Sequence, residues 1–142
     1  MTTSLMPNMM TENVNESVEF YCNNLGFRFL AGLREGAENL DGMQEVFAAD
    51  DPLQWAMLGR DEAKLMFQSQ ASLAQECASM QALPMSFAGT LYLEVASLDD
   101  LLSQIDKQVE VIVPDHVAFY GMRELWIRDN NGFILTLAQK AG

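Results

Sequence analysis

The chain has 142 residues, of which 49% are hydrophobic, and a formal net charge of −12 from 20 acidic and eight basic residues. This length is typical of one domain with a sizeable core, and so negative a charge repels phosphate backbones and argues against a nucleic-acid partner. No stretch reaches the roughly 18 consecutive apolar residues of a membrane-spanning helix, so we expect no membrane partner either.

The N-terminal residues and the cysteines indicate a compartment. The first seven residues contain neither a basic leader nor the apolar run of a secretory signal. Cys22 and Cys77 lie far apart and outside any metal-binding spacing, and Cys22 falls on the apolar stripe of a predicted helix. We therefore expect two reduced thiols in a soluble, cytoplasmic protein.

The first half of the chain predicts a βαβββ order. Residues 5–11 are expected to form a short strand, after which Asn13 and Glu16 have the form of a capping box that begins a helix. Apolar residues then recur at helical spacing until Gly26, where a left-handed residue ends the helix; they are Val14, Val18, Tyr21, Cys22 and Leu25. The remaining segments are predicted as a strand at 27–34, a long loop at 35–51 that suits a lid, and a hairpin of strands at 53–60 and 63–70.

The stretch after this hairpin predicts a helix at 72–83, which Pro84 ends. We therefore expect a first module at 1–70 and a linker with a short helix at 71–88.

The second half repeats the pattern over residues 89–142. A half-buried strand is expected at 90–95, and the capping sequence Ser97–Asp100 begins a helix whose apolar face is Leu98, Leu101, Leu102 and Ile105. A strand is then predicted at 109–113, ended by Pro114, followed by a loop that contains the only histidine, His116. Strands at 120–129 and 133–139 complete the module, with Asn131 and Gly132 supplying the positive φ angles of a tight turn. The prediction is a single α+β domain at 1–142, built from two βαβββ modules.

Several short segments carry a family resemblance. Pro7, Asn13-Val14, Ser17-Val18, Phe20-Tyr21 and Leu25-Gly26-Phe27 are similar to the opening of the vicinal oxygen chelate superfamily, which includes glyoxalase I, extradiol dioxygenases and bleomycin-resistance proteins. The segments Tyr120–Glu124 and Asp129–Phe133 resemble its closing motif. The resemblance implies that the two modules form an incomplete mixed-sheet barrel with a concave ligand face, and that the protein is a homodimer.

The resemblance also implies where a metal would bind, since metal-dependent members take their ligands from the first and fourth strand of each module. The matching positions are Met6, Met66, Thr90 and Thr136. None is an ordinary ligand of a hard or borderline divalent ion, for which imidazole and carboxylate are expected. A two-place slip would bring Gln68 or Glu94 onto the same face, about 6 to 7 Å along the strand. We expect no metal and no other cofactor.

Strand alternation predicts the lining of the concave face. Aromatic and methionine side chains would give contact area, and carboxylates would orient a ligand. The same side chains are also the ordinary filling of a barrel, and that interpretation stays open. The predicted ligand-binding residues are Trp55, Met66, Gln68, Thr90, Tyr92, Glu94, Glu124, Trp126, Arg128 and Thr136, with Met6, Asn8 and Met10 on the same face.

Three functions remain open. We favour a metal-free protein that resembles the bleomycin-resistance proteins and sequesters a small cationic aromatic molecule, in a role like antibiotic resistance. The reason is that an acidic protein with an aromatic face attracts such ligands. The alternative is a divalent-metal-dependent lyase or dioxygenase of the same superfamily, and a weaker variant uses Glu94 and Glu124 as an acid/base pair. The third is an interaction module whose cavity is filled by its own side chains. For His116, a general base and a solvated loop residue are both possible, because no partner can be identified from spacing.

Overall fold

The computed structural model describes residues 3–142, which form two compact units with one sheet each. The first unit comprises the residues up to Cys22 together with Gly26–Met85, and the second comprises Asn23–Leu25 with Ser86–Gly142. No helix in this described part of the chain is long and apolar enough to cross a membrane.

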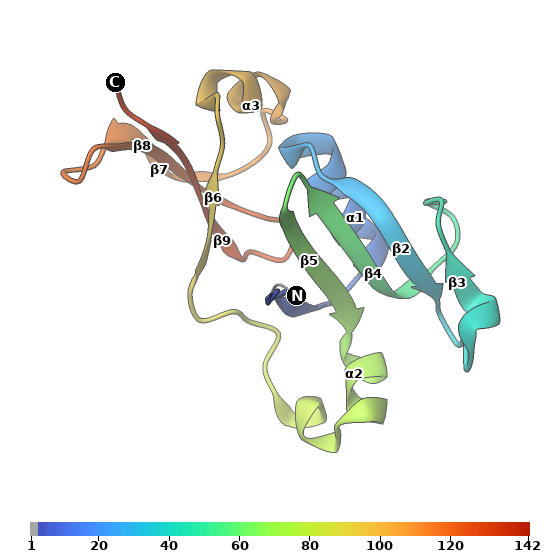
Figure 1. Ribbon diagram of the computed structural model, residues 1–142. Coiled ribbons are helices and arrows are strands. Elements are labelled where there is room, and N and C mark those ends of the chain that lie inside the picture. Colours follow the sequence, from blue (N-terminus) through green and yellow to red (C-terminus); the bar gives the residue numbers. More distant parts are fainter. Residues whose placement is uncertain (1–2) are drawn as a thin grey trace. The chain divides into compact units, whose positions relative to one another are not determined.

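The first sheet has five strands in the order β1-β5-β4-β2-β3 (Figure 1). Strand β1 pairs in parallel with β5, and the other neighbours are antiparallel. The strands are β1 (Asn8–Thr11), β2 (Arg28–Arg34), β3 (Met43–Gln44), β4 (Leu53–Arg60) and β5 (Ala63–Ser69). The predicted strand at 5–11 is therefore shorter at its beginning, and the predicted loop at 35–51 contains β3 and a 3-10 turn at Leu40–Gly42.

Helix α1 (Val14–Leu25) begins and ends as its sequence predicts. The Asn13 side chain accepts a hydrogen bond from the Glu16 amide, and Gly26 ends the helix with φ of 70°. The helix covers one face of the first sheet, where Tyr21 and Phe67 are fully buried with their ring centroids 4.9 Å apart. Cys22 is only half-buried, and its partial burial raises the pKa of the thiol.

Helix α2 differs from its prediction. It spans Gln70–Glu76 and begins at Ser69, whose hydroxyl accepts from the Ser72 amide; a separate 3-10 helix follows at Ala78–Ala82. The predicted helix at 72–83 is thus two shorter pieces, because the backbone at Cys77 is extended. Helix α2 belongs to the first unit and continues directly from β5 (Figure 1).

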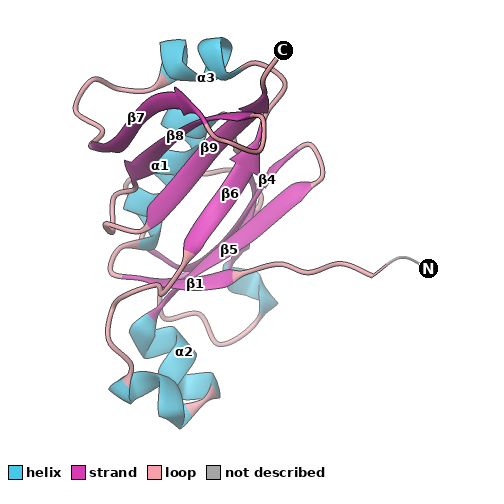
Figure 2. Cartoon of the chain, turned by 90° about the vertical axis from the view of Figure 1, so that its left-hand side faces the viewer, coloured by secondary structure: helices cyan, strands magenta, loops and turns pink. Residues whose placement is uncertain are grey.

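The second sheet has four strands in the order β6-β9-β8-β7, with helix α3 beyond one end (Figure 2). The elements are β6 (Thr90–Glu94), α3 (Leu98–Gln104), β7 (Val111–Val117), β8 (Met122–Arg128) and β9 (Ile134–Lys140). Strand β6 pairs in parallel with β9, and β7, β8 and β9 are antiparallel neighbours. The buried face includes the cross-strand pairs Leu125 with Leu137 and Ile127 with Leu135.

Three local predictions in this unit are wrong. Pro114 does not end a strand: β7 continues through it to Val117, because β7 is an edge strand with a register shift at this point, where a missing N–H is tolerated. His116 consequently lies in a strand and not in a loop. In the turn before β9, Gly132 alone has a positive φ, while the Asp129 carboxylate accepts from the amides of Asn131 and Phe133.

Candidate functional site

The sheet face opposite α1 carries the predicted ligand-binding residues of the first unit. Pairing places Leu33, Trp55 and Gln68 side by side across β2, β4 and β5. Met66 lies in the next row, beside Met57 and opposite Asn8 of β1. Trp55, Met66 and Gln68 therefore share one face, as strand alternation predicts.

Gln68 is the polar centre of this face. Its side chain is 4% exposed, and its carbonyl oxygen accepts from Asn8 Nδ2 at 2.8 Å. Its amide nitrogen donates to Ser72 Oγ at 2.8 Å and to Glu76 Oε1 at 3.4 Å. These contacts join β1, β5 and α2, so the amide is held in one orientation.

A cavity of about 630 Å³ opens over this face. Its apolar wall includes the Trp55 indole, and five of its lining residues carry side-chain amides. Glu38 and Glu76 are the charged residues among the described residues that line it. The lining consists of Asn8, Leu33, Ala37, Glu38, Asn39, Leu40, Met43, Gln54, Trp55, Gln68, Ser72, Gln75 and Glu76.

Gln54 explains how the predicted loop reaches the cavity. Its side chain is 9% exposed, and its amide nitrogen donates to the carbonyl oxygens of Arg34 at 2.9 Å and Ala37 at 3.2 Å. The loop is thereby fixed against β4, and Ala37 and Leu40 form part of the wall. Sequence reasoning missed Gln54 because a register shift in the β2–β4 pair interrupts strand alternation at this residue. It missed the α2 residues because strand alternation says nothing about a helix beside the sheet.

In the second unit, pairing brings all the predicted residues to one face. Tyr92, Thr136 and Trp126 lie side by side in one row, and Thr90 lies in the same row as Arg128. The hydroxyls of Thr90 and Thr136 are 3.0 Å apart and hydrogen-bonded to each other. The Arg128 guanidinium donates hydrogen bonds to Glu110 Oε2 at 3.0 Å and to the carbonyl oxygen of Gly132 at 3.1 Å.

Glu124 is the centre of this second face. It is 2% exposed, and its Oε2 accepts hydrogen bonds from Tyr92 Oη at 2.8 Å and from Tyr120 Oη. Its Oε1 lies 3.4 Å from Trp126 Nε1 and 4.0 Å from His116 Nε2. We call these five residues the Glu124 cluster.

The hydrogen bonds decide the charge of the Glu124 cluster. The bond from Tyr120, supported by those from Tyr92 and Trp126, holds the pKa of Glu124 below its ordinary value, although burial acts in the opposite direction. Burial and the bond to Glu124 raise the pKa of Tyr92 to about 12, and the bond to Glu124 also raises the pKa of Tyr120. At neutral pH the cluster thus holds a carboxylate and two neutral phenols.

Sequence reasoning missed Tyr120 and the partner of His116. Tyr120 lies in the β7–β8 turn, where Gly121 adopts a φ of 88° and its amide donates to the carbonyl of Ala118. Such a turn directs Tyr120 back to Glu124, four residues later. His116 lies directly opposite Glu124 in the β7–β8 pair. The sequence signal for Tyr120 was its place in the segment Tyr120–Glu124, which resembles the closing motif of a known family. That resemblance marked the segment but did not show which residues Tyr120 contacts.

The two predicted acid/base carboxylates are not in contact. Glu94 and Glu124 lie in the same row of the sheet, but Ala138 of β9 separates them. Two strand spacings put their backbones about 10 Å apart, and Glu94 is exposed. The geometry gives no shared proton between these groups.

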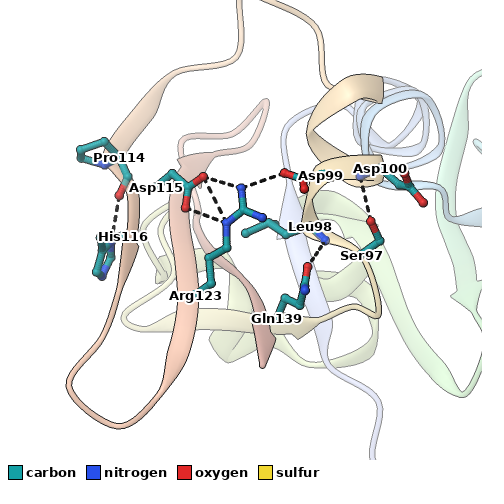
Figure 3. A network of polar contacts seen from close by, with 9 residues as sticks. All are labelled: Ser97, Leu98, Asp99, Asp100, Pro114, Asp115, His116, Arg123 and Gln139. Atoms are coloured by element: carbon teal, nitrogen blue, oxygen red, sulfur yellow. Dashed lines mark hydrogen bonds and ion pairs between the residues drawn. The ribbon is translucent and has the colours of Figure 1, made fainter. Parts of the chain in front are cut away.

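The opposite face of β8 carries a structural ion-pair network around Arg123 (Figure 3). Its guanidinium donates to Asp115 at 2.6 Å and to Asp99, in the first turn of α3, at 2.8 Å. Gln139 on β9 accepts from the Leu98 amide at 2.6 Å. These contacts tie the beginning of α3 to β7 and β9, so Arg123 stabilises the fold of this unit and is directed away from the Glu124 cluster.

The positions implied for a metal do not offer a fitting donor set. Met6 precedes β1, and Met66, Thr90 and Thr136 supply a thioether and two hydroxyls that bond to each other. Within residues 3–142, no group of three or more His, Cys, Asp or Glu side chains could hold a metal ion. The donor chemistry does not match a hard or borderline divalent ion.

Comparison with known proteins supports the fold and the family. Three solved structures resemble the chain at low identity: a protein of unknown function from Agrobacterium tumefaciens str. C58 (18% identity, TM-score 0.71, covering 98% of this chain and 94% of that one), TioX from Micromonospora sp. ML1 (14%, 0.63, 99% and 98%), and a glyoxalase/bleomycin resistance protein/dioxygenase family enzyme from Burkholderia phytofirmans PsJN (12%, 0.68, 94% and 94%). No curated protein matches the sequence. The family model of the Glyoxalase/Bleomycin resistance protein/Dioxygenase superfamily matches residues 5–137. The chain belongs to this superfamily.

Proposed function

We propose that this protein binds a small, cationic, partly planar molecule in the cavity of its first unit, without a metal and without transforming it. One observation supports this most directly: the cavity combines an indole with two carboxylates, and no Lys or Arg of the described residues lines it. A cation is attracted both to the carboxylates and to the face of Trp55.

The size and rigidity of the cavity suit such a ligand. A volume of about 630 Å³ falls within the range of drug-sized ligand pockets. The Gln68 amide, fixed by Asn8 and Ser72, and the Gln54 amide, fixed on the loop, need little ordering when a ligand binds. These features favour binding.

The first experiment uses the Trp126→Phe protein, in which Trp55 is the only indole. The probe is 1-methylquinolinium, with neutral quinoline as its uncharged counterpart. We expect saturable quenching of Trp55 by the cation and at least fivefold weaker binding of quinoline, because loss of one charge contact at a partly exposed site costs about 1 kcal/mol.

Matched variants assign the site. Glu76→Gln is expected to weaken 1-methylquinolinium binding about fivefold, whereas Glu62→Gln, in the exposed β4–β5 turn, leaves it unchanged. Equal affinities of the cation and of quinoline, or an unchanged affinity in Glu76→Gln, would contradict the proposal.

Metal independence is tested by elemental analysis of protein purified without added metal or chelator. We expect no near-stoichiometric metal, unchanged binding in EDTA, and recovery of the probe without chemical change by mass spectrometry. Near-stoichiometric Zn²⁺, Ni²⁺, Mn²⁺ or Fe²⁺ would instead favour the metal-dependent lyase or dioxygenase.

We further propose that the protein acts as a cytoplasmic homodimer, on the strength of its superfamily membership. Sedimentation velocity should give the mass of two chains, each of 15.9 kDa, and a species of one chain at micromolar concentration would contradict this.

A further inference from the structure

We propose that the Glu124 cluster in the second unit is a separate recognition site for an organic ammonium group. The inference does not depend on the cavity of the first unit, because every residue that carries it lies in the second unit.

The first argument is a missing counter-charge. Glu124 is ionised and 2% exposed, and a buried charge is costly unless it is paired. Within residues 3–142 no Lys or Arg forms an ion pair with it: Arg123 is bound to Asp99 and Asp115, and Arg128 to Glu110. Among residues 3–142, the basic side chain that comes within 4.0 Å of the Glu124 carboxylate is His116.

The second argument is the direction of the hydrogen bonds. Tyr92 and Tyr120 both give their hydroxyl protons to Glu124, so their oxygens keep only lone pairs for any other group. His116 Nδ1 lies 2.8 Å from the Pro114 carbonyl oxygen, to which it can only donate. The two phenol oxygens and the carboxylate therefore offer hydrogen-bond acceptors and a negative charge to a ligand.

The third argument is the aromatic surroundings. Tyr92 and Tyr120 are 50% and 55% exposed, and Trp126 is half-buried on the same face. Two phenols and an indole around one carboxylate are the composition of sites that bind quaternary ammonium ligands through cation–π contacts. A primary or quaternary ammonium supplies the positive charge that the carboxylate lacks, and its methyl or methylene groups contact the rings.

The test uses Trp55→Phe protein, in which Trp126 is the only indole, with choline as the probe and 3,3-dimethylbutan-1-ol as its neutral isostere. We expect choline to change Trp126 fluorescence saturably and the isostere to bind at least tenfold more weakly. Glu124→Gln, which keeps the shape and an acceptor for the tyrosines, should weaken choline binding at least tenfold. Asp100→Asn, which changes an exposed carboxylate of α3 outside the cluster, should change it less than twofold.

A second variant guards against a folding defect in Glu124→Gln. Tyr92→Leu keeps the carboxylate but removes one aromatic ring that the trimethylammonium group would contact, and we expect a threefold to tenfold loss of choline affinity by calorimetry, with an unchanged circular dichroism spectrum. Absence of choline binding up to about 50 mM, far weaker than cation–π cages usually bind, would overturn the proposal. So would equal affinity for the isostere or an unchanged affinity in a folded Glu124→Gln protein. Binding in the first unit is measured by Trp55 fluorescence in the Trp126→Phe protein, so one proposal can be contradicted while the other is supported.

Discussion

Glu124 is a carboxylate that stays ionised although it is buried on one face of the second sheet. Three hydrogen bonds from Tyr120, Tyr92 and Trp126 offset part of the cost of removing its carboxylate from water, although no Lys or Arg of the described residues pairs with it. Its neighbour Arg123 points to the other face and pairs with Asp115 and Asp99. Alternation along one strand thus separates a structural charge from the charge that we propose to bind a ligand.

The pH dependence of the free energy of unfolding should show that Glu124 is ionised in the folded protein. Because its pKa in the folded protein lies below the ordinary value of 4.5, the unfolded chain binds the proton more tightly. The stabilisation is therefore present above about pH 4.5 and is lost as the pH falls through the folded pKa. Urea unfolding from about pH 3 to pH 7 should show a smaller pH dependence in Glu124→Gln than in the wild-type protein. Glu94→Gln is the control, and identical profiles for Glu124→Gln and wild type would contradict the assignment.

At the scale of elements, helix beginnings were the most predictable features. Asn13 and Ser97 each accept from the amide three residues on, as their sequences predict. Such caps are local, since donor and acceptor lie within one turn. The interruption between α2 and the 3-10 helix was not predictable, because apolar spacing continues across Cys77 while the backbone does not.

Removing the first cap gives a quantitative test. Asn13→Ala leaves the Glu16 amide without its side-chain acceptor, and we expect the free energy of unfolding to fall by about 1 kcal/mol. Chemical denaturation measures the change, and Glu12→Ala, an exposed residue just before the cap, should lie within about 0.5 kcal/mol of wild type. A loss in Asn13→Ala no larger than that of the control would contradict the capping role.

At the scale of the whole molecule, the net charge is −12, and each of the two sheets has a face that carries carboxylates and aromatic rings. The field of such a protein raises the local concentration of cations, and salt screens it over about 10 Å at 0.1 M ionic strength.

Salt should therefore separate charged from neutral ligands. We expect the affinity for 1-methylquinolinium to fall severalfold between about 0.05 M and 0.5 M NaCl, whereas that for quinoline changes less than twofold. Fluorescence titration at each salt concentration measures both. A cation affinity that does not depend on salt would show that the carboxylates contribute little to binding.

The sequence by itself determined the features that depend on local patterns. The βαβββ repeat, the caps, the alternation that placed Tyr92, Glu124 and Trp126 on one face, and the family all follow from periodicity and short motifs. The same patterns failed at Pro114, because its tolerance depends on β7 being an edge strand, which is a property of the whole sheet.

Only the tertiary structure decided which residues meet. Gln54 binds loop carbonyl oxygens 20 and 17 residues earlier in the chain, α2 closes a cavity over β5, and His116 and Tyr120 reach Glu124 through the β7–β8 turn. These contacts depend on register, turn geometry and the path of a loop, and none of them leaves a periodic trace in the sequence. The sequence therefore predicts which residues share a sheet face, whereas only the folded structure decides which side chains on that face contact one another.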